Sequence, residues 1–342
     1  MPHIHLSAVP EEEQRSPGGK FHSWCRNVSV ALGAPRNTGL WGGGHPFDVQ
    51  IRRLPPGAAV CPLHLHYNQW ELFVVRAGSG TVRADGGRHE IKAGDVFIHP
   101  PHAAHQLINT GTDDLEVLII ADNPQLDLCY YPDSDKWGGR SFGKVFRITP
   151  CDYFDGEEAP AADSTPGAYQ PPPRPAPPVI PPFAQRRVAI EALAWEKFDS
   201  PKRKFRGESK QLSLALGAAP NKPTGLGGHP FDLELGKLPP GFSGVPYHAH
   251  TNQWECYLIV EGTGTMRTAG GDLALAPGDL VMHPPGELHQ LRNTGPTDLL
   301  YFLVADNPAI DTWRYPDSDK WGHNAPRKIF RATDADYWDG EE

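Results

Sequence analysis

The octet HLHYNQWE occupies residues 64–71, and the octet HAHTNQWE occupies residues 248–255. The two stretches share six of eight residues, and both end on a glutamate. Two interpretations compete for a histidine-rich segment that occurs twice in one chain. Either a structural unit has been duplicated without any chemistry, or the chain carries two metal sites.

The repetition extends far beyond the octets, because other segments recur at the same offset of 184 residues. Among them are HPFD, LPPG, HPP, YPDSDKWG and DGEE, in the same order in both halves. Between the halves lies a proline-rich segment that includes QPPPRPAPP, a composition typical of an extended polyproline linker. We therefore predict a first domain over residues 8–158, a linker over residues 159–187 and a second domain over residues 188–342.

Within each copy, the apolar residues form short runs, such as WELFVV and DLEVLIIAD in the first half and WECYLIV and DLLYFLVAD in the second. Glycine, aspartate, asparagine and proline separate these runs roughly every 8–12 residues, which is typical of a small β-sandwich or barrel. The fold class is therefore predicted to be all-β, with two barrels in tandem. One short helix is expected over residues 186–197.

The bulk properties narrow the function classes. The net charge is −9, which argues against a general nucleic-acid-binding protein, because such proteins are basic. No apolar stretch is long enough for a membrane-spanning helix, and the N-terminal residues lack the apolar core of a secretory signal. The five cysteines are odd in number and do not follow the repeat, so we expect free thiols in a reducing cytoplasm.

The histidines of the octets have the spacing of metal ligands on a strand. Side chains alternate between the two faces of an extended strand, so the two histidines of each H-x-H pair point the same way. The glutamate five residues after each pair can complete the set, together with a histidine from the later segment PPHAAHQLIN or PPGELHQLRN. The candidate metal ligands are His64, His66, Glu71 and His105 in the first copy and His248, His250, Glu255 and His289 in the second.

These segments resemble the two sequence motifs of the cupin superfamily. The first motif places H-x-H before a glutamate and a glycine, and the glycines here are Gly78 and Gly262. The second motif places two glycines, a proline and a histidine before an asparagine, and His102 replaces one of these glycines in the first copy. The glycine that precedes the first histidine, Gly57 or Gly241, lies earlier than the family motif has it. The resemblance covers both halves, and the chain is identified as a bicupin whose YPDSDKWG segment is similar to a loosely characterised bacterial cupin group.

Resemblance to the cupins implies two jelly-roll barrels, also called double-stranded β-helices, of the germin type. It implies that the two barrels pair within the chain as a pseudo-dimer, and it is compatible with a homo-oligomer. It further implies a metal centre in each barrel, and thus up to two divalent transition metals per chain. Plant seed-storage cupins keep the fold without these ligands, so the fold alone does not require them.

Three imidazoles and one carboxylate form a borderline-to-hard ligand set. Such a set suits Fe, Mn, Ni, Zn, Co or Cu, and we favour Fe or Mn. Four protein ligands leave part of an octahedral coordination sphere open to water or to a small-molecule substrate. An open position of this kind is what a catalytic metal site needs.

Three functions are compatible with these sites. The resemblance to bicupin enzymes favours a metal-dependent, dioxygenase-type oxidoreductase, in which Glu71 or Glu255 shifts to act as a catalytic base on a small organic substrate. The alternatives are a redox-neutral isomerase or lyase acting on a sugar or small acid, and a non-catalytic metal- or ligand-binding cupin. Different residues flank the two H-x-H pairs, so one site could be catalytic and the other structural.

Further pairs of repeated residues are secondary candidates. A histidine before each motif proline could carry protons near the metal or simply pack there, and two glutamine pairs could hold the free N–H of a ligand imidazole. An arginine pair could bind an anionic substrate or lie on a solvated strand face. In the same order, these residues are His99 and His283, Gln69 and Gln253, Gln106 and Gln290, and Arg83 and Arg267.

The remaining repeated segments are interpreted as structural. His45 and His229 are expected in turns or in packing, and YPDSDKWG is expected to form a turn held by side-chain hydrogen bonds rather than a calcium loop. Its tryptophan, Trp137 or Trp321, is expected to pin the tail of each copy against a barrel. Cys61, which the second copy does not repeat, is interpreted as a core residue.

Overall fold

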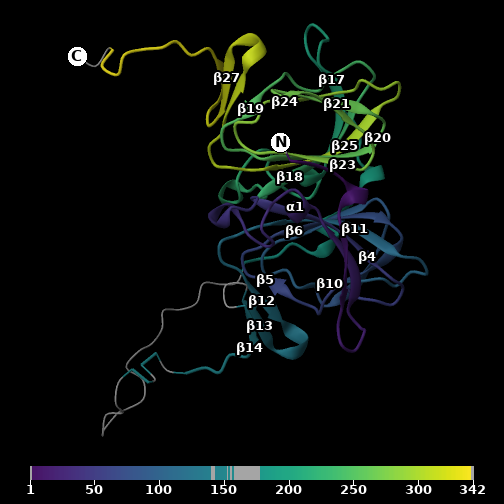
Figure 1. Cartoon of the computed structure of the whole chain (residues 1–342). Coiled ribbons are helices and arrows are strands. Elements are labelled where there is room, and N and C mark those ends of the chain that lie inside the picture. Colours follow the sequence, from purple (N-terminus) through teal and green to yellow (C-terminus); the bar gives the residue numbers. More distant parts are fainter. Residues whose placement is uncertain (1, 140–142, 152, 155, 158–177, 340–342) are drawn as a thin grey trace.

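Two barrels of antiparallel strands make up the molecule (Figure 1). The structure is a computed structural model and describes residues 2–139, 143–151, 153–154, 156–157 and 178–339. The N-terminal half, drawn in purple and blue, forms one barrel, and the C-terminal half, drawn in green and yellow, forms the other. The predicted all-β class with two tandem jelly-roll barrels is confirmed.

The first barrel combines one large sheet with two smaller ones. The seven-stranded sheet has the order β15-β9-β6-β11-β4-β3-β2, and the smaller sheets have the orders β10-β7-β8 and β14-β13-β12-β5. Its strands are β2 (Glu11–Arg15), β3 (His22–Asn27), β4 (Phe47–Leu54), β5 (Leu65–His66), β6 (Glu71–Ala77), β7 (Ser79–Ala84), β8 (Gly87–Lys92), β9 (Asp95–His99), β10 (His105–Ile108), β11 (Leu115–Asp122), β12 (Leu128–Tyr131), β13 (Lys136–Gly139), β14 (Lys144–Phe146) and β15 (Arg187–Ala189).

The second barrel repeats this plan. Its seven-stranded sheet has the order β1-β23-β20-β25-β18-β17-β16, and its smaller sheets have the orders β22-β21-β24 and β19-β26-β27-β28. Its strands are β1 (His3–His5), β16 (Glu196–Asp199), β17 (Arg206–Gln211), β18 (Phe231–Leu238), β19 (Ala249–His250), β20 (Glu255–Glu261), β21 (Gly264–Thr268), β22 (Gly271–Leu275), β23 (Asp279–His283), β24 (His289–Arg292), β25 (Leu299–Asp306), β26 (Thr312–Tyr315), β27 (Lys320–Asn324) and β28 (Arg327–Phe330).

Helical segments are short in both barrels. The two α-helices, α1 (Val28–Ala31) and α2 (Leu212–Ala215), follow the equivalent strands β3 and β17. No helix in the described part of the chain is long and apolar enough to cross a membrane. The 3₁₀ turns are η1 (Leu6–Ala8), η2 (Leu40–Gly42), η3 (Pro132–Ser134), η5 (Phe183–Gln185), η6 (Ile190–Ala192), η7 (Thr224–Leu226) and η8 (Pro316–Ser318). All five cysteines are free thiols, as predicted.

The two copies exchange their first strands. β1 pairs with β23 of the second barrel, whereas β15, which is equivalent to β1 at the offset of 184 residues, pairs with β9 of the first barrel. The predicted helix over residues 186–197 is wrong, because this segment forms β15, η6 and the start of β16. The edge of β9 offers unpaired backbone groups that the segment satisfies as a strand. The predicted linker lies mostly outside the described residues, and the domain boundaries stay a prediction.

The central strands of each large sheet are buried on both faces. In β6, Leu72 and Val74 face the other barrel, whereas Phe73 and Val75 face the interior of their own barrel. Neighbouring side chains on a strand point to opposite faces, so a strand that is buried on both faces needs a continuous apolar run. This explains why WELFVV and WECYLIV lack polar alternation.

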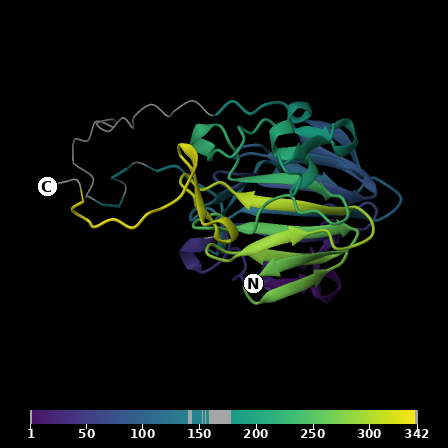
Figure 2. The same ribbon diagram turned by 90° about the horizontal axis from the view of Figure 1, so that it is seen from above.

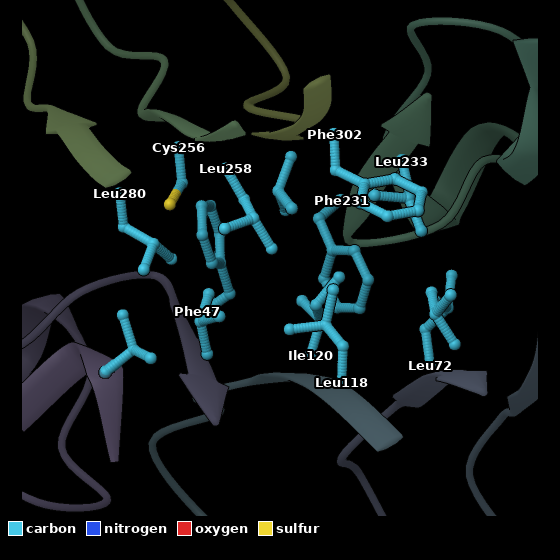
Figure 3. Close-up of a cluster of buried hydrophobic side chains, with 14 of the residues drawn as sticks. Phe47, Leu72, Leu118, Ile120, Phe231, Leu233, Cys256, Leu258, Leu280 and Phe302 are labelled. Carbon is cyan, nitrogen blue, oxygen red and sulfur yellow. The ribbon is translucent and has the colours of Figure 1, made fainter. Parts of the chain in front are cut away.

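The two large sheets pack face to face through a shared apolar core (Figure 3). Phe47 and Phe231 are equivalent residues, and their ring centroids lie 6.1 Å apart in this core. The predicted pairing of the two barrels within one chain is therefore confirmed. Other members of the core are Leu72, Leu118 and Ile120 from the first barrel and Leu233, Cys256, Leu258, Leu280 and Phe302 from the second.

Two reciprocal aromatic contacts join the barrels beside this core. The ring of Trp70 lies 5.1 Å from that of His229, and the ring of Trp254 lies 5.1 Å from that of His45. Burial lowers the pKa of His229 to about 4, so this imidazole packs as a neutral ring. The interpretation of His45 and His229 as packing residues is confirmed. The tryptophan of each octet packs on the histidine of the other barrel.

The YPDSDKWG segments form turns, as predicted. Each turn contains a 3₁₀ turn, η3 or η8, followed by an aspartate in the left-handed region, Asp135 at φ 46° or Asp319 at φ 47°. Trp137 packs on Tyr130 and Tyr67, at 4.8 and 5.3 Å between ring centroids, and so holds the first tail against its own barrel. In the second copy, the hairpin β27–β28 lies at one side of the barrel, and the segment after it extends outward (Figure 2).

Candidate metal centres

The ligands predicted in each copy come from four neighbouring parts of the barrel. In the first barrel, His66 lies in β5, Glu71 begins β6 and His105 begins β10. His64 forms an isolated bridge with His105, so the backbone registers these two residues opposite each other. The second barrel places its four predicted ligands in the equivalent positions, with a bridge between His248 and His289.

In the first centre, the four predicted side chains converge. Nε2 of His64 lies 3.1 Å from Nε2 of His66, and Nε2 of His105 lies 2.8 Å from Oε2 of Glu71. Nε2 of His66 lies 3.7 Å from the same carboxylate oxygen. Three ring nitrogens and a carboxylate oxygen therefore share one small volume inside the barrel.

The second centre has nearly the same geometry. Nε2 of His289 lies 2.7 Å from Oε2 of Glu255, and Nε2 of His250 lies 3.7 Å from Oε1 of Glu255. The ring centroids of His248 and His289 are 4.5 Å apart, as are those of the equivalent pair in the first barrel. All eight predicted ligands are thus brought together as two sets of four.

Every ligand imidazole is oriented through its other ring nitrogen. Nδ1 of His64, His105, His248 and His289 lies 2.9–3.1 Å from a backbone carbonyl oxygen. A carbonyl can only accept a hydrogen bond, so Nδ1 carries a proton and Nε2 points to the centre. Imidazoles that lose their Nε2 protons beside a carboxylate are the donor set that a divalent transition metal binds, so the residues fit such an ion.

The remaining imidazole of each centre is held by an aspartate that the sequence analysis missed. Nδ1 of His66 donates to Asp127 at 2.6 Å, and Nδ1 of His250 donates to Asp311 at 2.6 Å. These aspartates follow their histidines by 61 residues in both copies, at the same offset of the repeat. The repetition marks these aspartates as shared by both copies, although it does not show which residues they contact.

The NQ residues of each octet support these aspartates. Oδ1 of Asp311 accepts from the backbone N–H groups of Asn252 and Gln253, at 2.9 and 3.2 Å. The side chain of Asn252 donates to the carbonyl of Ile310, one residue before the aspartate. The first octet makes the same bonds to Asp127. The identical NQ pairs therefore orient the second histidine of each H-x-H through its aspartate.

The ligand carboxylates are ionised in this environment. Burial favours the protonated form of Glu255, but the hydrogen bond from His289 and the other ligand imidazoles outweigh burial. They hold the pKa of Glu255 well below its ordinary value, and burial opposed by the imidazoles has the same net result for Glu71. An ionised carboxylate suits metal ligation.

His99 and His283 lie directly behind the centres. Each stacks on a ligand imidazole, with centroids 3.9 Å apart for His99 and His105 and 4.0 Å apart for His283 and His289. Burial lowers the pKa of His283 to about 4, and burial also lowers the pKa of His99. Neutral, stacked rings support the packing role rather than proton transfer. Nδ1 of His99 lies 3.1 Å from the buried guanidinium of Arg186, which reaches the first barrel from the segment before β15.

The contacts of the other secondary candidates are with the YPDSDKWG turns and the backbone. Arg83 and Arg267 each form a two-pronged ion pair with an aspartate of the YPDSDKWG turn, Asp133 or Asp317, which supports a structural role. The four glutamines, Gln69, Gln106, Gln253 and Gln290, donate to backbone carbonyls. Cys61 is wrongly predicted as a core residue, because it is half-buried and its Sγ lies 3.5 Å from Nδ1 of His64.

In the first copy, His102 replaces a glycine of the second cupin motif, and its backbone conformation is strained. His102 takes a φ of 68°, in the left-handed region, and the equivalent Gly286 takes a φ of 85°. A side chain in this region costs about 1–2 kcal/mol relative to glycine. The ring of His102 packs edge-on against Tyr67, at 4.7 Å between centroids, which offsets part of the strain.

The surroundings of the two centres differ. A cavity of about 520 Å³ reaches His248, His250 and Glu255 in the second barrel. Its wall includes Trp313, and the equivalent residue in the first barrel is Cys129. Lys222, Arg327, Tyr315 and Asp311 also line this cavity.

A known protein family matches the two regions of the chain that contain the centres. The family model described as "Cupin domain" matches residues 50–121 and again residues 234–305. The chain is a bicupin. Both matched regions contain the H-x-H pair, the glutamate and the distal histidine of one centre, so the family assignment and the two sets of ligands coincide.

Curated relatives align with parts of this bicupin. It is 41% identical over 68 residues to the oxalate-binding protein of Thermotoga maritima, which covers 20% of this chain and 55% of that protein. It is 24% identical over 259 residues to the 5-aminosalicylate 1,2-dioxygenase of Comamonas sp., which covers 73% of this chain and 63% of that enzyme. The alignments thus span less than two thirds of these relatives' own lengths.

Solved bicupin structures share the whole architecture. The formate complex of Lactobacillus farciminis oxalate decarboxylase has a TM-score of 0.54 and 16% identity, covering 90% of this chain and 86% of that one. A Bacillus subtilis oxalate decarboxylase described by its Mn(II) centres has a TM-score of 0.52 and 15% identity, covering 91% of this chain and 78% of that one. At these identities, the similarity shows the fold.

The aspartate behind His250 gives a direct test of the second centre. We expect Asp311→Asn to weaken metal binding there by about 10–100-fold, the usual effect of removing a partner that orients a metal ligand. An asparagine has one side-chain oxygen in place of two, so it cannot accept from both His250 and the backbone of the octet, and one of these two bonds must be lost. Calorimetric titration of the metal-free protein with Mn(II) measures the effect. Binding at the first centre is the internal control and should not change.

Proposed function

We propose that this bicupin is a metal-dependent enzyme that acts on a small carboxylic acid at its second centre. The cavity that ends on His248, His250 and Glu255 carries this proposal. Its volume of about 520 Å³ lies within the usual range for small-molecule sites. A substrate bound there would lie against the open side of the ligand set.

The charges of the cavity favour an anionic substrate. Lys222 and Arg327 line it, whereas the equivalent residues of the first barrel are the uncharged Thr38 and Gly143. The two carboxylates of the lining are already engaged, Glu255 by His289 and Asp311 by His250. Two cations therefore face a cavity whose carboxylates do not neutralise them, which suits a ligand with its own carboxylate.

The aromatic wall favours a substrate with a flat or apolar part. Trp313 and Tyr315 lie on the same cavity, and their rings can pack on a planar substrate. The names of the relatives point in the same direction, since one binds oxalate, one acts on 5-aminosalicylate and one is a decarboxylase of oxalate. Both of these compounds are carboxylates.

The reaction class that we favour is a dioxygenase-type oxidation, with a decarboxylating lyase as the alternative. A relative that aligns over 73% of this chain is a dioxygenase, whereas several solved structures of similar fold are oxalate decarboxylases. A bound Mn or Fe ion would supply Lewis acidity and, for the oxidation, a binding position for O₂. The chain's own residues would bind the carboxylate and exclude bulk water. A catalytic base role for Glu71 or Glu255 stays a prediction, as does a cytoplasmic location.

Turnover assays separate these reactions. The protein is loaded with Mn(II) or Fe(II) and incubated with oxalate, salicylate, 5-aminosalicylate and aliphatic hydroxy acids. Consumption of O₂ with incorporation of both oxygen atoms supports a dioxygenase, and release of CO₂ without net consumption of O₂ supports a lyase. Tight binding of a carboxylate without any turnover would contradict an enzyme and support a ligand-binding cupin.

Two substitutions test the assignment of the cavity. We expect Lys222→Thr, which installs the residue of the first barrel, and Arg327→Gln each to raise KM about tenfold or more. A hydrogen bond to a charged group contributes about 1.5–3 kcal/mol, and about 1.4 kcal/mol corresponds to a tenfold change. Steady-state kinetics with the best substrate of the panel measure this. Unchanged KM in both variants would place the substrate elsewhere.

A further inference from the structure

The carboxylate ligands of the two centres differ in one contact. The hydroxyl of Tyr257 donates to Oε2 of Glu255 at 2.9 Å, inside the second barrel. The equivalent residue of the first barrel is Phe73, which has no hydroxyl to offer Glu71. The ligands themselves are the same residue types in both centres. The two centres therefore differ in a residue that contacts a ligand, Tyr257 in the second and Phe73 in the first.

The ring of Tyr257 is fixed, so its hydroxyl has a defined direction. The ring meets His283 edge-on at 5.7 Å and His289 edge-on at 6.1 Å between centroids. Phe73 makes the equivalent contacts with His99 and His105, at 5.6 and 6.0 Å. The two rings therefore occupy the same place, and the hydroxyl alone distinguishes them.

The second barrel has a second tyrosine and a glycine next to Tyr257, where the first barrel has other residues. Tyr301 packs beside Tyr257 at 5.7 Å, where the first barrel has Val117. A Cβ atom on Gly236 would overlap the ring of Tyr301, and the first barrel has Arg52 at that position. The glycine and the tyrosine thus form a matched pair. The first barrel's interior core around Phe73 is apolar by comparison.

We propose that Tyr257 is a positioning residue that makes the second centre the tighter of the two metal sites. A buried hydroxyl bonded to a ligand carboxylate keeps that carboxylate in one orientation before the metal arrives. Glu71 lacks this bond and is positioned through its contacts with the ligand imidazoles His66 and His105. The proposal concerns metal binding and does not depend on the reaction that the second centre performs.

Metal titrations of variants that retain one centre test the proposal. His105→Ala leaves the second centre to be measured, and His289→Ala leaves the first. Calorimetric titration with Mn(II), without substrate, should give a tighter site in His105→Ala than in His289→Ala. In the His105→Ala background, Tyr257→Phe should weaken binding by about 10–100-fold. Tyr301→Phe removes a hydroxyl from the same barrel and should leave the affinity unchanged.

The paramagnetic resonance spectrum of bound Mn(II) separates positioning from general loss of structure. A reoriented Glu255 should change this spectrum in Tyr257→Phe and not in Tyr301→Phe. Equal affinities in His105→Ala and His289→Ala would overturn the inference that the second centre is tighter. Unchanged affinity and spectrum in Tyr257→Phe would overturn the role of the tyrosine. Since no substrate is present, failure of the proposed reaction would affect none of these results.

Discussion

His289→Ala is expected to lower turnover by at least about a thousand-fold, whereas His105→Ala should lower it at least tenfold less. A metal ion contributes several kcal/mol to stabilising charge in a transition state, and each 1.36 kcal/mol is about tenfold in rate. Loss of a ligand at the second centre removes that contribution where the cavity of about 520 Å³ delivers a substrate. Loss of a ligand at the first centre acts on turnover only through the packing of the barrels.

The metal content of the same variants supplies the control for this comparison. Elemental analysis should show that each variant loses the metal of one centre and keeps that of the other. Circular dichroism should show unchanged strand content in both, because the ligands lie at the ends of strands that the apolar core holds in place. Equal losses of turnover in the two variants, with these controls met, would contradict a division of labour between the centres.

The ligand sets were predictable because most of their geometry is local. His248 and His250 share a strand face, and Glu255 begins the next strand, so the octet itself places three of the four ligands. The fourth, His289, follows from the resemblance to the cupin motifs. The all-β class was predictable for a similar reason, since short apolar runs between turn residues report the strands directly.

The features that the sequence analysis missed depend on pairing between distant strands. Tyr257 lies in an apolar run, and only the fold shows that its hydroxyl meets Glu255. Asp311 orients His250 across 61 residues, a distance at which spacing alone carries no information about contact. From its sequence position, Arg267 could bind an anionic substrate, but in the folded chain it forms an ion pair with Asp317. The exchange of first strands was missed because either barrel edge could accept β15.

Phe231→Ala is expected to lower the free energy of unfolding by about 3–5 kcal/mol, the usual cost of truncating a fully buried phenylalanine. Phe231 is completely buried in the core between the barrels, where its ring faces that of Phe47. The neighbouring side chains come from both barrels, so the vacated volume cannot collapse without moving one barrel against the other. Urea denaturation of the metal-free protein, followed by tryptophan fluorescence and circular dichroism, measures the change.

Phe198→Ala is the matched control for this substitution. Phe198 lies in β16 and is 52% exposed, so its truncation should change the unfolding free energy by less than about 0.5 kcal/mol. Both probes should also report a single transition, because β1 and β15 tie each barrel to the other's sheet. Two separate transitions, or equal effects of Phe231→Ala and Phe198→Ala, would contradict the conclusion that the two barrels are stabilised as one unit by their shared core.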